Sequence, residues 1–361
     1  MSAPSERIRP EIRALAAYHV PPSGASVKLD AMENPYPWPD AAIRDEWAQA
    51  LAAVGVNRYP DPRGERVVQR LRAHIELACG QDLLLGNGSD ELIQLITLAV
   101  ASPGAKVLVP EPTFVMYRMI ATFCGLECIG VPLTDDFELD GPAMEAAIDA
   151  HDPAVVWLAW PNNPTGNAWP RAAVRRILER SNGLVVVDEA YQPFAQASWI
   201  DALGEHDNLL VLRTLSKLGL AGLRLGFLAG PPSVLEAVDK LRLPYNVNAL
   251  TQAGVAFALD HFPRLERQAA QIRRERDALA ARLAGLPGLT VYPSAANFLL
   301  LRVPAGRARP IFEGLLGEDI LIKCLDGAHP RLTDCLRVTI GTPPENERLA
   351  EALGRQLEAR G

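Results

Sequence analysis

Lys217 lies at the centre of the segment 213–226, between an apolar run and the glycines at 219 and 222. An amine at the mouth of a buried strand, in a turn lined by glycine, loses much of its hydration. It is then displaced toward the neutral form that attacks an aldehyde. A lone lysine in a loop is more often a solvated charge, so this interpretation depends on the neighbouring segments.

A carboxylate and a phenol follow the apolar run 184–187. Asp188 is expected at the carboxyl end of a buried parallel strand, where open α/β sheets bind ligands. A protonated pyridine nitrogen would compensate this carboxylate and make the ring an electron sink; the alternative is an aspartate that caps the next helix. Asn163, in the turn-forming segment 161–166, can donate to a phenolate oxygen, although alone this segment predicts only a turn.

The elements that must position these residues are those of an α/β protein. Strands are predicted near residues 106–109, 126–132, 154–160, 184–188, 209–213 and 224–229, with helices such as 171–180 between them. This alternation predicts a mostly parallel sheet with helices on both faces. Beyond residue 231 the predicted helices precede short strands, which is the α+β pattern of a smaller second domain.

The composition narrows the classes of function. The chain has 361 residues, 48% of them hydrophobic and 22% charged, with a net charge of -7, as in an ordinary globular protein of two domains. An acidic chain lacks the basic footprint of nucleic-acid binding, and no apolar run approaches the roughly 18 residues of a membrane helix. The start lacks a signal-peptide core, so a cytoplasmic protein is expected. Five scattered cysteines and six dispersed histidines predict no metal site.

These segments resemble the fold type I aminotransferases that depend on pyridoxal 5'-phosphate (PLP), and within them the histidinol-phosphate aminotransferase family. The resemblance covers about residues 29–342, with matching blocks at 28–36, 58–62, 86–92, 112–117, 161–166, 184–191, 213–226, 244–248, 296–298 and 336–341. It implies a large PLP-binding domain, residues 31–260, with a mostly parallel seven-stranded sheet flanked by helices. Residues 1–30, as an N-terminal arm, and 261–361 would form the smaller α+β domain.

The resemblance also assigns the cofactor site. Lys217 would hold PLP as a Schiff base and carry a proton to and from the substrate, and Asp188 would keep the ring nitrogen protonated. Donors to the ring oxygen would be Asn163 and Tyr191, and Phe114 would stack on the ring. The phosphate would be held by Gly88, Ser89 and Asp90 ahead of a helix N-terminus, and by Thr214, Ser216 and Arg224. Arg224 follows Lys217 by seven residues where many relatives have eight, so a tighter loop is expected.

A second set of residues is implied for the substrate. Arg337, on a predicted apolar strand, would hold the substrate's anionic group. Lys323 stands where this family often has arginine, and it keeps the charge but not the bidentate fork. The remaining candidates are Tyr18, Asn34 and Asn297. Tyr59 would reach across a homodimer interface to the partner's cofactor phosphate.

The reaction implied is transfer of the amino group of L-glutamate to 3-(imidazol-4-yl)-2-oxopropyl phosphate, which gives L-histidinol phosphate and 2-oxoglutarate in histidine biosynthesis. An aromatic amino-acid aminotransferase and a threonine-phosphate decarboxylase would share the cofactor residues and differ around Tyr18, Lys323 and Arg337. A non-catalytic PLP-binding protein is disfavoured because Lys217, Asp188 and Tyr191 are all present.

Overall fold

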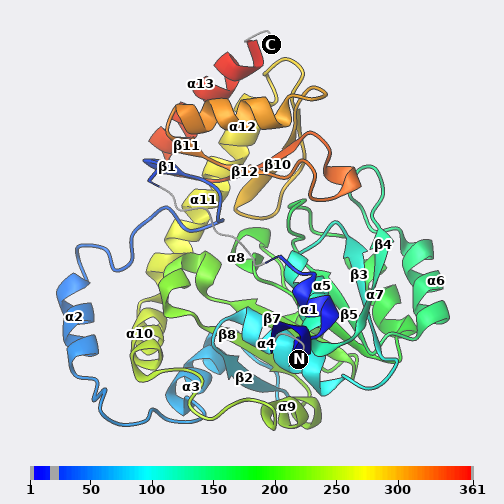
Figure 1. The fold of residues 1–361 in the computed structure, drawn as a ribbon. Coiled ribbons are helices and arrows are strands. Elements are labelled where there is room, and N and C mark those ends of the chain that lie inside the picture. The colour runs from blue at the N-terminus through cyan, green and yellow to red at the C-terminus, as the bar shows by residue number, and fades with distance from the viewer. Residues whose placement is uncertain (1–3, 17–23, 359–361) are drawn as a thin grey trace.

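The larger part of the chain is built on a seven-stranded sheet (Figure 1). The computed structural model describes residues 4–16 and 24–358. The strands are β2 (Asp82–Gly86), β3 (Lys106–Glu111), β4 (Glu127–Pro132), β5 (Val155–Ala159), β6 (Leu184–Asp188), β7 (Leu209–Thr214) and β8 (Gly226–Gly230). Their order is β2-β8-β7-β6-β5-β3-β4, and β8 is antiparallel to both of its neighbours while the other paired strands are parallel. The predicted mostly parallel sheet is confirmed.

Helices cover both faces of this sheet, because alternate residues of each buried strand point to opposite sides. Val186 and Leu210 pack with the helices of one face, and Val187 and Val211 pack with those of the other. The helices of this part are α2 (Arg44–Ala52), α3 (Glu65–His74), α4 (Ser89–Ala99), α5 (Val115–Cys124), α6 (Gly141–His151), α7 (Arg171–Arg180), α8 (Gln192–Ala195), α9 (Pro232–Asp239) and α10 (Ala249–Asp260). Short turns of helix are η1 (Pro4–Arg7), α1 (Pro10–Arg13), η2 (Ile200–Ala202), η3 (Ser216–Leu220) and η4 (Ala221–Leu223).

The smaller part carries an antiparallel sheet of four strands, in the order β12-β13-β10-β9. These are β9 (Thr290–Val291), β10 (Phe298–Arg302), β12 (Lys323–Cys324) and β13 (Cys335–Thr339); a separate parallel pair joins β1 (Val27–Lys28) to β11 (Ile320–Leu321). Its helices are α12 (Ala308–Gly317), η5 (Pro330–Leu332) and α13 (Pro343–Glu358). The pairing of β1 with β11 brings residues 27–28 against this part, which has the expected α+β composition, whereas α1 contacts α5 of the larger part.

The long helix α11 (Phe262–Leu283) connects the two parts (Figure 1). It contacts α8 and η3 on one side and α13 and β10 on the other. The predicted boundary at residue 260 falls at the last residue of α10. The assignment of 31–260 to one domain, and of 1–30 with 261–361 to another, stays a prediction.

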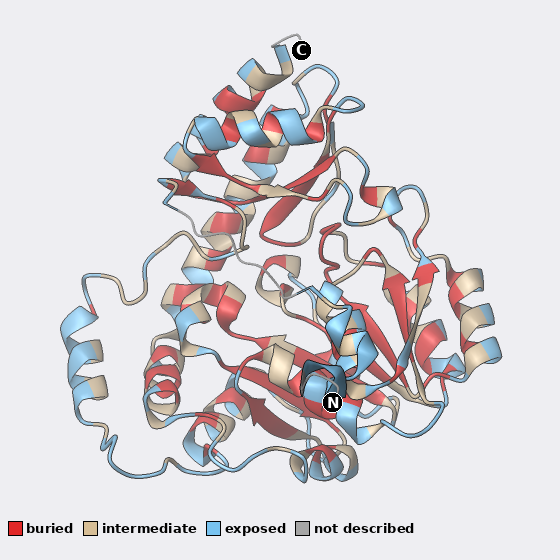
Figure 2. Cartoon of the chain, in the orientation of Figure 1, coloured by how far each residue is buried: buried red, intermediate tan, exposed pale blue. Residues whose placement is uncertain are grey.

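Buried residues concentrate on the strands of both sheets (Figure 2). The helix α2 has no buried residue and lies at the edge of the molecule, where Trp47 packs against Phe257 of α10 (Figure 1). Nothing among the helices in residues 4–16 and 24–358 combines the length and apolarity that crossing a membrane requires.

Candidate active site

A cavity of about 380 Å³ opens at the carboxyl ends of β5, β6 and β7, with β12 and β13 of the small sheet on its other side. The structure brings most of the predicted site residues to it: Ser89, Asp90, Phe114, Asn163, Asp188, Tyr191, Thr214, Ser216, Lys217, Arg224, Lys323 and Arg337. Residues as far apart in sequence as Ser89 and Arg337 therefore meet at the edge of the sheet that the β6 and β7 motifs indicated.

Lys217 lies on the turn η3, which follows the end of β7. Its Nζ donates to the main-chain oxygen of Ala31 at 3.2 Å. Burial lowers the pKa of Lys217 to about 8, and the nearby charge of Arg337 adds to this effect. The amine therefore reaches its neutral, nucleophilic form close to neutral pH.

Asp188 ends β6 with its carboxylate in the cavity wall. It accepts hydrogen bonds from the Tyr117 hydroxyl at 2.7 Å and from the main-chain N–H of Ala190 at 3.0 Å. Burial raises the pKa of Asp188 to about 6, and the hydrogen bond from Tyr117 opposes this rise. The carboxylates of Asp90 and Glu189 raise it further. A cationic ring nitrogen is the group that complements such a site.

Asn163 links a phenol to a guanidinium. Its Nδ2 donates to the Tyr191 hydroxyl at 3.1 Å, and its Oδ1 accepts from Nη1 of Arg337 at 2.6 Å. The Tyr191 hydroxyl also lies 3.2 Å from the sulfur of Met32. The bond from Arg337 fixes which end of the Asn163 amide points to Tyr191. The Nδ2 group of Asn163 and the Tyr191 hydroxyl are therefore neighbouring groups in the cavity wall.

Two cations stand side by side on the small sheet. Lys323 of β12 and Arg337 of β13 are directly paired in the strand register, and both line the cavity. Arg337 is buried and also donates from Nη2 to the main-chain oxygen of Asp30 at 3.0 Å. An anionic ligand would meet a fixed guanidinium and a flexible ammonium at this end of the cavity.

The opposite end of the cavity has the character of an anion site. Ser89 begins α4, so the free N–H groups of that helix face the same space. The hydroxyls of Thr214 and Ser216 lie 2.9 Å apart, and Nη1 of Arg224 donates to the Ser216 hydroxyl at 3.3 Å. Nη2 of Arg224 lies 3.8 Å from a carboxylate oxygen of Asp90, the pKa of which is raised by burial.

Gly88 supports this end without lining the cavity. Its φ of 82° lies in the region that favours glycine, and a Cβ there would come within 2.8 Å of Nη2 of Arg224. Arg224 itself is left-handed, with φ 50°, after the short turns η3 and η4. The chain between Lys217 and Arg224 thus closes through two tight turns.

Besides Gly88, three predicted residues of the described part of the chain, Asn34, Asn297 and Tyr59, do not line the cavity. Asn34 donates to the main-chain oxygen of Leu218 at 2.9 Å, and buried Asn297 donates to that of Met32, also at 2.9 Å. Both hold the backbone next to the cavity. Tyr59 is 80% exposed and stacks on Tyr245 with ring centroids 4.4 Å apart. Tyr18 lies outside the described residues.

Sequence reasoning missed Tyr117, which sits at the centre of the acid site. Its ring is fully buried, stacks on Trp157 at 5.1 Å and touches the edge of Phe114 at 5.5 Å. The signal was available, because Tyr117 follows Phe114 by three residues at a helix start and must share its face. Asp30, Ala31, Met32 and Met116 also line the cavity unpredicted. The described part of the chain contains no cluster of three or more side chains suited to a metal ion.

The family model described as aminotransferase class I and II matches residues 26–353. Histidinol-phosphate aminotransferase 2 of Cupriavidus pinatubonensis is 53% identical, over 97% of this chain and 96% of that protein. Histidinol-phosphate aminotransferase of Chromobacterium violaceum is 52% identical, over 96% of this chain and 97% of that protein. A solved structure of histidinol-phosphate aminotransferase from Sinorhizobium meliloti, in complex with pyridoxal 5'-phosphate, is similar with a TM-score of 0.87, at 27% identity and over 98% of each chain.

Proposed function

The chain belongs to the class I and II aminotransferase family, and we propose that it moves the amino group of L-glutamate to 3-(imidazol-4-yl)-2-oxopropyl phosphate, giving L-histidinol phosphate and 2-oxoglutarate. Its cofactor is PLP. The relatives with this activity in their names are about half identical over nearly the whole chain. The observation that carries the proposal is the placement of the Lys323 and Arg337 cations in the same cavity as the Lys217 amine. The Lys217 amine can then act on two different substrates, because each carries an anionic group that the two cations can bind.

The described residues fit PLP. A buried carboxylate with carboxylate neighbours suits the ring nitrogen, and the Ser216, Thr214 and Arg224 donors beside the start of α4 suit the phosphate. When bound, PLP supplies an aldehyde carbon that takes up an amine and a ring that withdraws electrons from it.

Lys217 has the properties of both the anchoring amine and the acid–base group. With a pKa lowered by burial to about 8, Nζ exchanges protons near neutral pH, where general acid–base catalysis is most effective. Nζ is the atom that would take the proton from the substrate's α-carbon. Asp188 ionises above a pKa of about 6, so it is charged at neutral pH and would hold the proton of the ring nitrogen in place. The N–H of Asn163 and the hydroxyl of Tyr191 orient the ring oxygen.

Arg337 is the residue that both substrates would share. Its guanidinium is fixed by Asn163 and the oxygen of Asp30, so it can bind a carboxylate or a phosphate with little loss of side-chain freedom. Lys323 adds a second charge without a fixed direction. This suits a phosphate ester, which carries more negative charge than the side-chain carboxylate of glutamate.

A homodimer with Tyr59 at the partner's phosphate site is part of the proposal. Large apolar side chains stand exposed on two adjacent segments, with Tyr59 at 80%, Leu243 at 74% and Val56 at 71%. Tyr59 stacks on Tyr245, which joins the two segments into one surface. Exposed apolar surface of this kind marks an interface. We also propose that the protein acts in the cytoplasm and that residues 31–260 form the cofactor-binding domain.

The test is a set of single half-reactions. Purified protein loaded with PLP is mixed separately with histidinol phosphate, phenylalanine, aspartate and threonine phosphate, and the absorbance of the bound cofactor is followed as it changes to the amine form. Rapid conversion by histidinol phosphate, with little by the others, supports the proposal. Faster conversion by phenylalanine would assign an aromatic aminotransferase, and release of carbon dioxide from threonine phosphate would assign a decarboxylase.

A further inference from the structure

A buried ion pair lies directly behind two of the cofactor residues. Glu189 follows Asp188 at the end of β6, and Arg213 precedes Thr214 at the end of β7. Nε of Arg213 donates to Oε2 of Glu189 at 2.8 Å. The side chains are 0% exposed for Glu189 and 14% exposed for Arg213. Two such charges are costly to bury, so their presence at this place needs a reason.

The pair and the cofactor residues lie on opposite faces of the same two strand ends. Val187 and Val211 pack in the core of one face, and Glu189 and Arg213 follow each of them by two residues, so they share that face. Asp188 points to the other side and lines the active-site cavity, and Thr214 lines that cavity while it also borders the side of the ion pair. Each residue of the ion pair is therefore joined to a cofactor residue by a single peptide unit.

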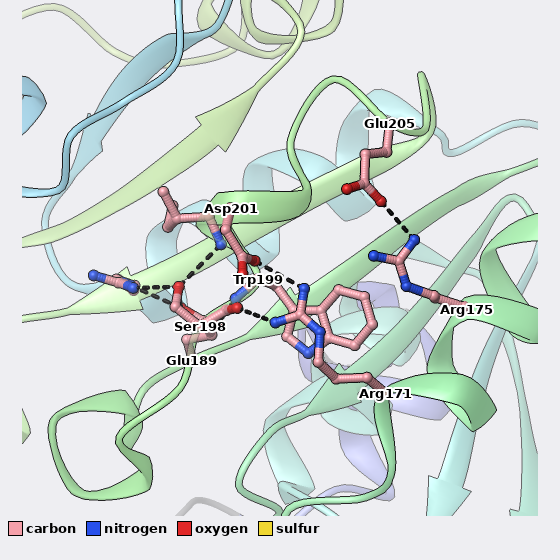
Figure 3. Close-up of polar contacts among 9 residues, drawn as sticks. Arg171, Arg175, Glu189, Ser198, Trp199, Asp201 and Glu205 are labelled. Carbon is pink, nitrogen blue, oxygen red and sulfur yellow. Dashed lines mark hydrogen bonds and ion pairs between the residues drawn. The ribbon is translucent and has the colours of Figure 1, made fainter.

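Hydrogen bonds from residues 198–199 complete the pair, and Figure 3 shows Ser198 and Trp199 beside Glu189. Glu189 accepts from the main-chain N–H of Trp199 and, at 3.0 Å, from the hydroxyl of Ser198. Nη2 of Arg213 donates to the same hydroxyl at 2.6 Å. Arg171 secures this loop from outside, because it donates to the main-chain oxygen of Ser198 and lies 4.3 Å from the ring of Trp199.

Open space adjoins these strand ends on the side of the ion pair. Glu189, Ser198, Arg213 and Thr214 all line a second cavity, of about 590 Å³, which the substrate cations do not line. The main-chain hydrogen bonds of the sheet already pair the two strands, so the ion pair acts on their last residues in addition to that ladder. Besides the ion pair, the N–H of Glu189 donates to the oxygen of Leu212 at 2.7 Å, which ties the two strands where the side-chain network begins.

We propose that Glu189 and Arg213 are positioning residues for the cofactor: their ion pair locks the ends of β6 and β7, so that Asp188 and Thr214 hold the ring nitrogen and the phosphate of PLP at a fixed separation. Neither residue touches the cofactor. The inference rests on PLP occupying the active-site cavity as proposed above. It extends that proposal to a network on the opposite face of the sheet.

Glu189→Gln tests the proposal most directly, because it keeps the size of the side chain and removes its charge. Arg213→Lys is the second variant, since it keeps the charge and loses the fork that contacts Glu189 and Ser198 together. The control is Arg175→Gln, which breaks the ion pair of Arg175 with Glu205, 2.5 Å long but exposed at both ends (Figure 3). Three quantities are measured for each: the Kd of PLP for the apoenzyme, the KM of glutamate for the loaded enzyme, and the Tm of the apoenzyme.

Glu189→Gln is expected to raise the Kd of PLP by about 10-fold or more, the range typical of residues that orient a ligating side chain. The KM of glutamate, which depends on Arg337, should stay unchanged, and Arg213→Lys should have a smaller effect of the same kind. A lower Tm of Glu189→Gln with an unchanged Kd of PLP would show that the ion pair is purely structural. An equal rise of the Kd of PLP in Arg175→Gln would show the same. If Glu189→Gln does not fold, an unchanged Kd in Arg213→Lys overturns the proposal.

The wild-type titration separates this inference from the proposed function. Failure of the wild-type apoenzyme to bind PLP would overturn both. Binding of PLP by the wild type, together with unchanged binding by the variants, would overturn only the positioning role.

Discussion

Replacing the lysine at the centre of the site should stabilise the empty protein. Burial lowers the pKa of Lys217 from 10.5 to about 8, so keeping the ammonium in the folded chain costs up to about 3 kcal/mol. Lys217→Met removes this cost and fills a similar volume. It also removes the hydrogen bond to Ala31, worth about 1 kcal/mol. The expected net gain is about 2 kcal/mol at pH 7.

The gain should depend on pH in a defined direction. The folded pKa lies below the unfolded value, so between pH 8 and 10.5 the unfolded chain binds more protons and the stability of the wild type rises with pH. Below pH 8 the wild type carries the full cost. The advantage of Lys217→Met should therefore be greatest at pH 7, and by pH 9.5 the titration should have removed more than half of the cost.

Thermal unfolding of the apoenzymes at fixed protein concentration measures this effect. For a chain of 361 residues a gain of about 2 kcal/mol raises the Tm by about 3 °C. Lys240→Met is the matched control, because it makes the same substitution at an exposed lysine at the end of α9, outside the cavity. A Lys217→Met apoenzyme that is no more stable than the wild type at pH 7, or an advantage that is the same at pH 9.5, would refute the reasoning.

Three further predictions concern the acid, the substrate cations and the interface. Asp188→Asn should lower kcat by about 100-fold or more. Tyr117→Phe should move the acid limb of the pH–kcat profile up by about 1 unit, because the Tyr117 hydrogen bond lowers the pKa of Asp188. An acid limb that does not move in Tyr117→Phe would contradict this role of the hydrogen bond. Arg337→Ala should raise the KM of glutamate and of the phosphorylated substrate by about 10-fold or more. Lys323→Ala should raise mainly the KM of the phosphorylated substrate. An equal rise of both KM values in Lys323→Ala would count against the role proposed for Lys323. Tyr59→Phe should raise the Kd of PLP about 5-fold with an unchanged mass in light scattering, and a monomeric wild type would remove the basis of this prediction.

The local motifs predicted several residues that the structure brings to one cavity. Asp188 ends an apolar strand, Lys217 and Asn163 come shortly after one, and parallel strands bring their carboxyl ends to one edge of a sheet. An apolar run that ends in a polar or turn residue is enough to predict such positions. Asn34 and Asn297 were less predictable as cavity residues, because a polar side chain can serve the ligand or the backbone beside it. Their donations to Leu218 and Met32 were visible only in the fold.

By itself the sequence determined the order of strands and helices, the ends of the strands and the chemical types of the groups placed there, because these follow from residues close together in the chain. The tertiary structure decided which groups meet. Arg337 contacts Asn163 across 174 positions, and Tyr117 contacts Asp188 across 71. It also decided their ionisation, since the pKa of about 8 for Lys217 and of about 6 for Asp188 arise from burial by distant segments. Desolvation depends on the whole surrounding volume, which no local pattern encodes.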